Sequence, residues 1–260
     1  MPVASLLEVR NISKHFGGVK AVDGLSFDIP QGGLQAIIGP NGSGKTTCIN
    51  LITGCYHLTG GAVSFSGQRI DGLSRERIVQ TGLARTFQNL RLFETLTVLD
   101  HVLMGQFRHS RVDFLRTILG TRASKRESRD ALERSWDLLE LVGLKDKARV
   151  LAKSLPYGPR RLLEIARALA TRPTLLFLDE PAAGMSEEEI DRVIDLVRTI
   201  QKRGLTILLI EHRMRLVMNV SEHIIVLNYG KKIAEGSAKE IQENQEVITA
   251  YLGTQHEKLG

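Results

Sequence analysis

Three short, almost unbroken apolar runs constrain the fold more than any other feature of the chain. They span residues 34–38, 175–178 and 206–210, and they lead directly into a glycine-rich loop, Asp179-Glu180 and Glu211-His212, respectively. A strand without polar alternation is covered on both faces, which is typical of a parallel sheet between helices. Ligands bind at the carboxyl ends of such strands. The sequence therefore predicts an α/β fold in which these three segments share one site.

The glycine-rich loop carries the most specific motif. Residues 39–46, GPNGSGKT, match the pattern G-x-x-x-x-G-K-[ST] between a strand and a helix expected from about Thr47. In this pattern glycines let backbone N–H groups converge on phosphate oxygens, and the helix N-terminus adds its positive end. Lys45 is the candidate for contacting the β- and γ-phosphates, and the Thr46 hydroxyl for binding Mg²⁺. The flanking strand and helix argue against a glycine-rich turn that matches by accident.

The other two strand ends supply the side chains for catalysis. Asp179 is expected to hold the Mg²⁺ shell, and Glu180 to orient and deprotonate an attacking water. A lone histidine is more often structural than catalytic. The position of His212 at an end of the same sheet favours a contact with the γ-phosphate. We therefore predict Lys45, Glu180 and His212 as the catalytic residues.

Helix and turn signals organise the rest of the chain. Ser186 and Glu189 have capping-box spacing ahead of an apolar stripe from Ile190 to Ile200. Residues 224–234 predict a hairpin around a turn at 228–230, followed by a short helical tail to Leu252. Residues of about 90–153 show few strand signals and many basic side chains, which indicates an inserted helical subdomain with a solvated charged face.

Composition limits location and partners. The 260 residues are 42% hydrophobic and 25% charged, which suits one large α/β domain with an insertion. No apolar run is long enough to span a bilayer, and residues 1–16 carry charges where a signal peptide needs an apolar stretch. We therefore expect a cytosolic protein. The formal charge of +6 indicates an anionic partner without choosing between nucleotide, membrane surface and nucleic acid.

The two cysteines are not expected to pair. Cys48 and Cys55 stand seven residues apart on what reads as one helix. Their Cα atoms would then lie about 10 Å apart, beyond the reach of a disulfide. We expect two buried thiols that behave as small hydrophobic residues.

These motifs, in this order and spacing, resemble the nucleotide-binding subunit of an ATP-binding cassette (ABC) transporter over residues 5–253. The segments DEPAAGM, IEHRM, KKIAEG and VITAYLG are similar to the branch that imports branched-chain, hydrophobic amino acids. The resemblance implies a P-loop NTPase fold with a RecA-like core and an antiparallel β-subdomain. It also implies a helical subdomain inserted at residues 89–155 and a C-terminal tail of that branch at 232–255.

The resemblance also assigns roles to single positions. It implies that Phe16 stacks on adenine, that Gln88 is the residue of the glutamine loop, and that the loop from Leu155 is the signature, which faces the ATP of a second subunit. The implied metal ligands are Thr46, Gln88 and Asp179. The complete set of expected nucleotide-binding residues is Phe16, Gly39, Pro40, Asn41, Gly42, Ser43, Gly44, Lys45, Thr46, Thr47, Gln88, Leu155, Pro156, Tyr157 and Gly158.

Four positions depart from the family pattern. Pro156 and Pro159 stand where the signature has serine and glutamine, Ser186 replaces the usual aspartate of the D-loop, and Arg213 stands where this branch often has aspartate. Pro156 offers no hydroxyl to a γ-phosphate. Pro159 is expected to begin the following helix without penalty, because the first helical position has no N–H partner to lose. We expect a signature that is weakened but not destroyed.

The implied function is an importer ATPase that uses ATP and Mg²⁺. The implied partners are a second, identical or different ATPase subunit, integral membrane permease subunits and, indirectly, a solute-binding protein, with no nucleic acid. The implied location is peripheral, at the cytoplasmic face of the inner membrane. Three alternatives stay open: the ATPase of a lipid or lipopolysaccharide exporter, a soluble ABC ATPase acting on nucleic acid or the ribosome, and a sensor without turnover. The single cassette argues against the second, and an intact Glu180 against the third.

Overall fold

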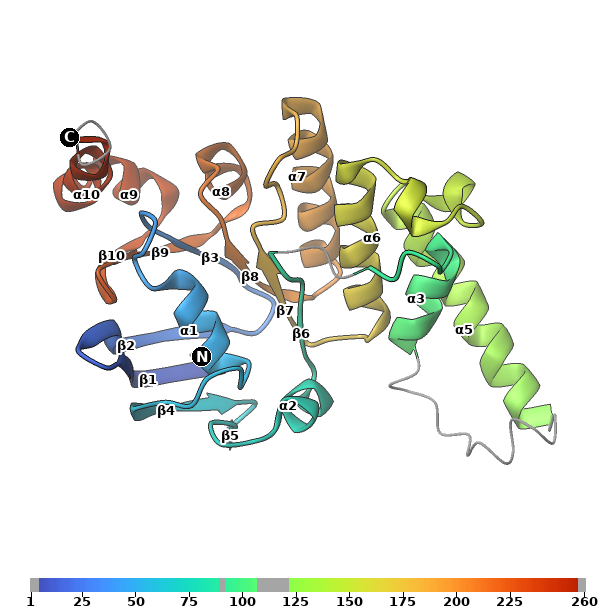
Figure 1. Cartoon of the computed structure of the whole chain (residues 1–260), viewed down its shortest axis with the longest axis horizontal. Coiled ribbons are helices and arrows are strands. Elements are labelled where there is room, and N and C mark those ends of the chain that lie inside the picture. Colours follow the sequence, from blue (N-terminus) through green and yellow to red (C-terminus); the bar gives the residue numbers. More distant parts are fainter. Residues whose placement is uncertain (1–4, 89–91, 107–121, 257–260) are drawn as a thin grey trace.

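The computed structural model describes residues 5–88, 92–106 and 122–256. Its centre is a six-stranded sheet of order β10-β9-β3-β8-β7-β6 (Figure 1). The strands are β3 (Leu34–Ile38), β6 (Leu83–Arg85), β7 (Leu175–Asp179), β8 (Thr206–Ile210), β9 (His223–Asn228) and β10 (Lys231–Gly236). All neighbouring pairs are parallel except the β9–β10 hairpin. The three apolar runs are thus the adjacent strands β3, β8 and β7, as predicted.

The apolar runs are unbroken because each of these strands is buried on both faces. Along β3, Ala36 and Ile38 join one hydrophobic cluster, whereas Ile37 joins another. The first cluster lies under helices such as α7 (Glu187–Lys202) and α8 (Met214–Val220). The second lies between the sheet, α1 (Lys45–Ile52) and a second sheet. Because successive side chains of the strand point alternately into one cluster and the other, no position on the strand faces solvent, where a polar side chain would be favoured.

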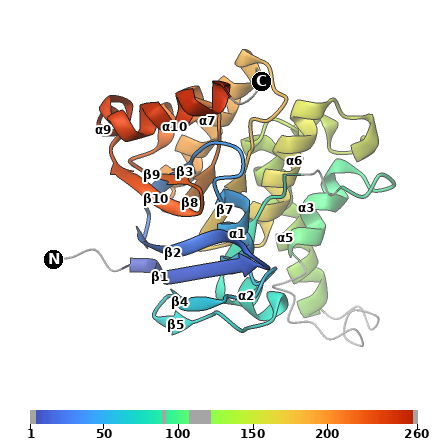
Figure 2. The same ribbon diagram turned by 60° about the vertical axis from the view of Figure 1, so that its left-hand side comes forward.

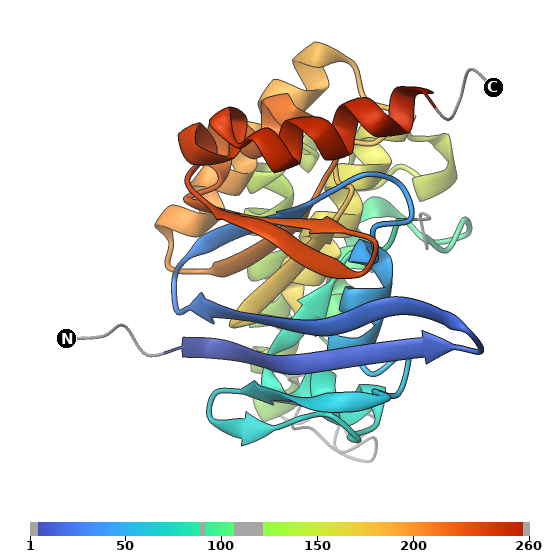
Figure 3. The same cartoon turned by 90° about the vertical axis from the view of Figure 1, so that its left-hand side faces the viewer.

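The second sheet is antiparallel and has the order β2-β1-β4-β5. Its strands are β1 (Ser5–Phe16), β2 (Val19–Pro30), β4 (Gly60–Phe65) and β5 (Gln68–Arg69). Figure 3 shows β1 and β2 running beneath the β9–β10 hairpin, with helices α9 (Ala238–Glu243) and α10 (Gln245–His256) above it. This is the antiparallel β-sheet unit expected from the sequence.

A group of helices packs at one side of the six-stranded sheet (Figures 1 and 2). It consists of α3 (Val98–Gln106), α5 (Arg122–Leu141) and α6 (Tyr157–Ala170). The short helix α2 (Arg75–Thr81) precedes β6 and lies below it in Figure 1, and its Ile78 belongs to the second hydrophobic cluster. Residues 89–91 and 107–121 of the predicted helical insertion lie outside the described residues. Within the described part of the chain, no helix is both long enough and apolar enough to cross a membrane.

Local signals were accurate at several helix and strand ends. Ser186 caps α7 and exchanges hydrogen bonds with Glu189 in a complete capping box, and the predicted hairpin is β9–β10. The helix after the glycine-rich loop begins at Lys45, two residues before the expected start.

The prediction for the cysteines was wrong in part. Helix α1 ends at Ile52, and the chain turns at Gly54, which has φ of 69°. Cys55 therefore lies beyond the helix and is only partly buried, whereas Cys48 is fully buried. Burial raises the pKa of Cys48 to about 12. Both thiols are free, as expected, but not because one helix holds them apart.

Candidate active site

The glycine-rich loop encloses the side chain of Lys45. Its Nζ donates hydrogen bonds to the carbonyl oxygens of Gly39 at 2.7 Å and Pro40 at 2.9 Å. Burial lowers the pKa of Lys45, although the nearby carboxylates of Glu180 and Asp179 oppose that shift. Only glycine allows the chain to wrap so closely at position 39, because a Cβ there would lie 2.1 Å from a backbone oxygen of β9. A phosphate oxygen can replace these carbonyls as the acceptor for Lys45.

The start of α1 provides further donors. Gly44 is its N-cap in the left-handed region, at φ of 102°, and its first turn has no side-chain cap. The N–H groups of Lys45, Thr46 and Thr47 therefore remain available to an anion, which the helix N-terminus also attracts. Ahead of the helix, Ser43 is buried, whereas Asn41 and Gly42 are exposed.

The three predicted metal ligands come together around one pocket. Thr46, Gln88 and Asp179 line a cavity of about 470 Å³. Hydroxyl, amide and carboxylate oxygens are hard donors that suit Mg²⁺, which uses few protein ligands and completes its shell with water and phosphate oxygens. No cluster of three His, Cys, Asp or Glu residues within the described ranges could hold a metal alone. The residues present thus fit a magnesium ion that arrives with a phosphate ligand.

Glu180 lies between Gln88, a predicted metal ligand, and His212, a predicted catalytic residue. Gln88 Nε2 donates to its Oε2 at 3.0 Å, and His212 Nδ1 lies 3.9 Å from its Oε1. The backbone of Glu180 has a left-handed φ of 48°, and its N–H donates to the carbonyl oxygen of Ile210 at 2.8 Å. A non-glycine residue in this conformation is strained and persists where its surroundings hold it. The carboxylate is thereby aimed at the same strand-end site as Gln88 and His212.

The site agrees with a family assignment made from the whole chain. The family model described as "ABC transporter" matches residues 22–183, and the model described as "Branched-chain amino acid ATP-binding cassette transporter" matches residues 231–257. The chain belongs to the ABC transporter family. The resemblance inferred from the motifs is therefore confirmed, and this cassette is an ATPase of transport.

Similar proteins extend over nearly the whole cassette. The high-affinity branched-chain amino acid transport ATP-binding protein BraF of Pseudomonas aeruginosa is 43% identical over 95% of this chain and 98% of its own length. The high-affinity branched-chain amino acid transport ATP-binding protein LivG of Escherichia coli is 40% identical over 95% of this chain and 98% of its own length. A nucleotide-free cassette from an ABC transporter has a TM-score of 0.82 and 32% identity, covering 95% of this chain and 99% of its own. The ADP conformation of MJ1267, an ATP-binding cassette of an ABC transporter, has a TM-score of 0.83 and 33% sequence identity, and the match covers 96% of this chain and 99% of that one.

The predicted signature loop lies at the start of α6, outside the lining of the pocket. Pro156 is the N-cap and is exposed, as is Tyr157, whereas the Leu155 side chain is buried in the core. Gly158 is covered by the carboxylate of Glu189, because a Cβ at this position would lie 2.1 Å from Glu189 Oε1. The capping box of α7 thus packs directly against the signature.

Pro159 does not begin α6, which starts two residues earlier at Tyr157. The proline occupies the third helical position, and the first intrahelical bond runs from the N–H of Arg160 to the carbonyl of Pro156 at 3.1 Å. The first three N–H groups of a helix have no intrahelical partner. The expected absence of a penalty at Pro159 therefore holds for this position too.

Sequence reasoning missed a buried pair on α6 that contacts the glutamine loop. Arg161 Nη1 donates to the carbonyl oxygen of Phe87 at 2.6 Å, and Arg161 Nη2 donates to that of Gln88. Glu164 accepts the N–H of Phe87 at 3.2 Å. Burial raises the pKa of Glu164, against the lowering effects of the Phe87 N–H and Arg161. The only signal in the sequence is the charge of Arg161 and Glu164 beside the apolar positions of RLLEIARALA.

Glu211 was treated only as a neighbour of His212, yet it organises the loop around that residue. Its carboxylate is fully buried and accepts the backbone N–H groups of Ala182 at 3.1 Å, His212 at 2.7 Å and Arg213 at 3.1 Å. It therefore ties the segment after Glu180 to the segment that carries His212. Arg213 itself points to α7, where its Nη1 lies 3.6 Å from Glu187.

The proposed adenine contact is an exposed aromatic pair. Phe16 ends β1 with 45% of its surface exposed, and Tyr56 packs edge-on at 5.4 Å between ring centroids. Lys14 Nζ lies 5.1 Å from the centre of the Phe16 ring. Tyr56 was not identified from the sequence, because a lone tyrosine after a helix has no distinctive pattern. It adds a second aromatic surface beside Phe16.

Proposed function

We propose that this chain is the ATP-hydrolysing subunit of an importer for branched-chain or other hydrophobic amino acids. The observation that carries the proposal is the convergence of Lys45, Gln88 and the adjacent pair Asp179-Glu180, from three separate segments, on one strand-end site. The relatives described as branched-chain amino acid transport proteins, and the tail match at 231–257, support the substrate class. The cassette spans 5–253, with a helical subdomain at 89–155 and a branch-specific tail at 232–255.

Each residue has a defined task in hydrolysis. Lys45 transfers its hydrogen bonds from loop carbonyls to the β- and γ-phosphates, and the amides of the α1 first turn bind phosphate oxygens. Thr46, Asp179 and Gln88 are the residues that hold Mg²⁺, which when bound supplies positive charge to the transferred phosphoryl group. Glu180 accepts the proton of the attacking water. His212 contacts the γ-phosphate from the neighbouring strand end.

The signature completes a second cassette. The loop at residues 155–158 lies outside the lining of its own chain's pocket, so it serves the ATP of a second, identical or different ATPase subunit. ATP-driven closing and opening of that dimer moves integral membrane permease subunits, which receive solute from a solute-binding protein. The cassette works peripherally at the cytoplasmic face of the inner membrane, and nucleic acid is not a partner.

Uptake by cells that lack the gene tests the proposal. Wild type and Glu243→Gln, an exposed carboxylate on α9, should restore uptake of labelled leucine, whereas Glu180→Gln should not. The loss follows from removing the general base without a change of shape. If cells without the gene take up leucine undiminished and lose a lipid from their membrane, the importer proposal fails and the lipid exporter is favoured instead.

A further inference from the structure

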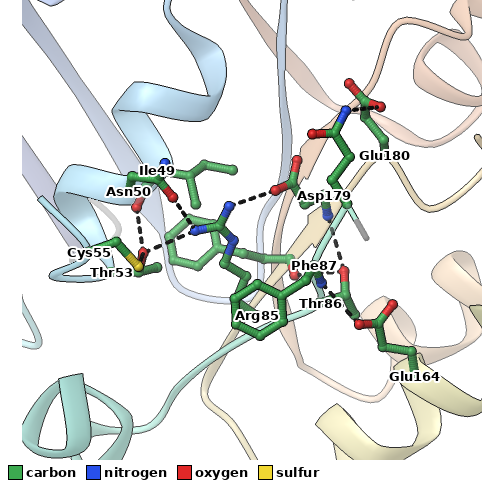
Figure 4. Close-up of polar contacts among 12 residues, drawn as sticks. Ile49, Asn50, Thr53, Cys55, Arg85, Thr86, Phe87, Glu164, Asp179 and Glu180 are labelled. Carbon is green, nitrogen blue, oxygen red and sulfur yellow. Dashed lines mark hydrogen bonds and ion pairs between the residues drawn. The ribbon is translucent and has the colours of Figure 1, made fainter. Parts of the chain in front are cut away.

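Arg85 links the carboxylate of Asp179 to the C-terminal half of α1. Its Nη2 donates to Asp179 Oδ2 at 2.7 Å. Its Nη1 donates to Asn50 Oδ1 at 2.7 Å and to Thr53 Oγ1 at 3.2 Å. Figure 4 shows the guanidinium between these groups, which come from β7, from α1 and from Thr53, the C-cap of α1. Both ends of the guanidinium are thus held, one by the candidate metal ligand and the other by the helix of the glycine-rich loop.

The pair is buried. The side chains of Arg85 and Asp179 are 9% and 2% exposed, and the guanidinium lies 5.3 Å from the centre of the Phe87 ring. Arg85 Nε has no hydrogen-bond partner within the described part of the chain. A carboxylate in such surroundings is costly without a counter-ion. Arg85 supplies that counter-ion to Asp179 while no metal ion is bound.

The same charge opposes a metal ion. A cation that approaches Asp179 is attracted by the carboxylate. It is also repelled by the guanidinium of Arg85, which is already paired with that carboxylate, because like charges at short distance repel. We propose that Arg85 is a positioning residue that sets the Mg²⁺ affinity of the nucleotide site by holding Asp179 Oδ2 and competing for its charge. This inference rests on the proposed role of Asp179 in holding Mg²⁺.

The proposal predicts opposite effects with and without metal. Arg85→Gln removes the cation paired with Asp179 and leaves only the charge of Lys45 nearby, so nucleotide phosphates should bind more weakly without metal. Mg²⁺ should bind more tightly, because its competitor is gone. The ratio of the nucleotide dissociation constant without Mg²⁺ to that with Mg²⁺ should therefore rise by about tenfold or more, as expected of one charge removed a few ångströms away. A purely structural role would weaken binding equally in both conditions.

Calorimetry on the full chain measures this ratio. The probe is AMP-PNP, which is titrated in EDTA and at a series of Mg²⁺ concentrations. In a second measurement Mn²⁺ replaces Mg²⁺, and electron paramagnetic resonance measures how much Mn²⁺ the complex binds. Arg85→Lys keeps the charge but not the fork that holds Asp179 and Asn50 together, so its ratio should lie between those of the wild type and Arg85→Gln. A ratio in Arg85→Gln that is unchanged or lower overturns the proposal.

Two further variants separate the possible failures. If Asp179→Asn leaves the Mg²⁺ dependence intact, the metal role of Asp179 fails; if it removes that dependence while Arg85→Gln has no effect, only the role of Arg85 fails. The double variant Arg85→Gln/Asp179→Asn should match Asp179→Asn alone, because the effect passes through the carboxylate. Should Arg85→Gln not fold, Asn50→Ala decides: loosening the guanidinium should tighten Mg²⁺ binding, and no change overturns the proposal.

Discussion

Arg161 Nη1 lies 2.6 Å from the carbonyl oxygen of Phe87, so α6, the helix that follows the predicted signature loop, holds the backbone beside Gln88. Glu164 completes the contact by pairing with Arg161 at 3.2 Å and accepting the N–H of Phe87 at 3.2 Å. Both side chains are buried. The backbone at Phe87 and Gln88 is therefore tied to α6.

Arg161→Leu should lower the free energy of unfolding by about 3 kcal/mol, because it removes the nearer cation of the buried Glu164 and leaves only Arg167, at 3.9 Å. The double variant Arg161→Leu/Glu164→Leu should recover part of that loss. Arg192→Leu, an exposed position on α7, should change stability by less than about 0.5 kcal/mol. Urea unfolding measures all three. Equal losses at positions 161 and 192 would contradict the structural role of the pair.

Lys45→Ala should weaken ATP binding by about tenfold to a hundredfold, the worth of a charge-assisted hydrogen bond to phosphate. Transport should be lost with it. Lys202→Ala, at the exposed end of α7, is the matched control and should bind ATP as the wild type does. A fluorescent ATP analogue reports both affinities. Wild-type affinity and ATPase activity in Lys45→Ala would refute the assignment of the glycine-rich loop.

The features that could be predicted from the sequence are those that depend on residues close to one another along the chain. The glycine-rich loop, the buried strands and the capping box at Ser186 each depend on residues within about ten positions of one another. Helix α1 was extended too far because its stop, Gly54, was overlooked although a left-handed glycine after a helix is a common end signal.

Contacts between distant segments were not predictable from one sequence. Arg85 and Asp179 are 94 residues apart, and Arg161 and Phe87 are 74 residues apart. Nothing in either local sequence identifies the partner, because a buried arginine and an exposed one look alike until the sheet order is known. The sheet places β6 beside β7, and only that adjacency brings Arg85 to Asp179, the candidate metal ligand.

Tyr251 should make the stability of the cassette depend on pH in the alkaline range. Burial raises its pKa to about 12, against the opposing effect of a hydrogen bond from the backbone of Gly39. An unfolded phenol has a pKa of about 10. Because the folded state holds the proton more tightly, this contribution is complete below about pH 10 and is lost as pH rises toward 12.

Urea unfolding at about pH 9 and pH 11 tests this dependence. The wild type should lose more stability between the two than Tyr251→Phe, which has no proton to release. Tyr229→Phe is the control, because Tyr229 is 72% exposed, and it should behave as the wild type does. The same pH dependence in wild type and Tyr251→Phe would show that the phenol on α10 is not the group responsible.

The two ATP sites should differ if the second cassette has an intact signature. The better site then contains Lys45, Glu180 and His212 of this chain, because the partner supplies its signature. Glu180→Gln here should reduce single-turnover hydrolysis in the assembled transporter more than the equivalent change in the partner. A larger loss from the partner's variant would contradict the assignment, and equal losses would mean that the prolines are neutral.

In a homodimer both sites carry the weakened signature, and Pro156→Ser should raise the ATPase rate. Pro156 caps α6 without a side-chain hydrogen bond, so a serine hydroxyl is free to reach the partner's γ-phosphate, a charge-assisted contact worth about 1.5–3 kcal/mol. The gain in rate should be about tenfold if 1.5 kcal/mol of it is expressed in the transition state. Pro156→Ala removes the ring without adding a hydroxyl and should leave the rate near that of the wild type. A faster Pro156→Ala would assign the defect to the proline backbone, and equally slow serine and alanine variants would contradict the hydroxyl argument.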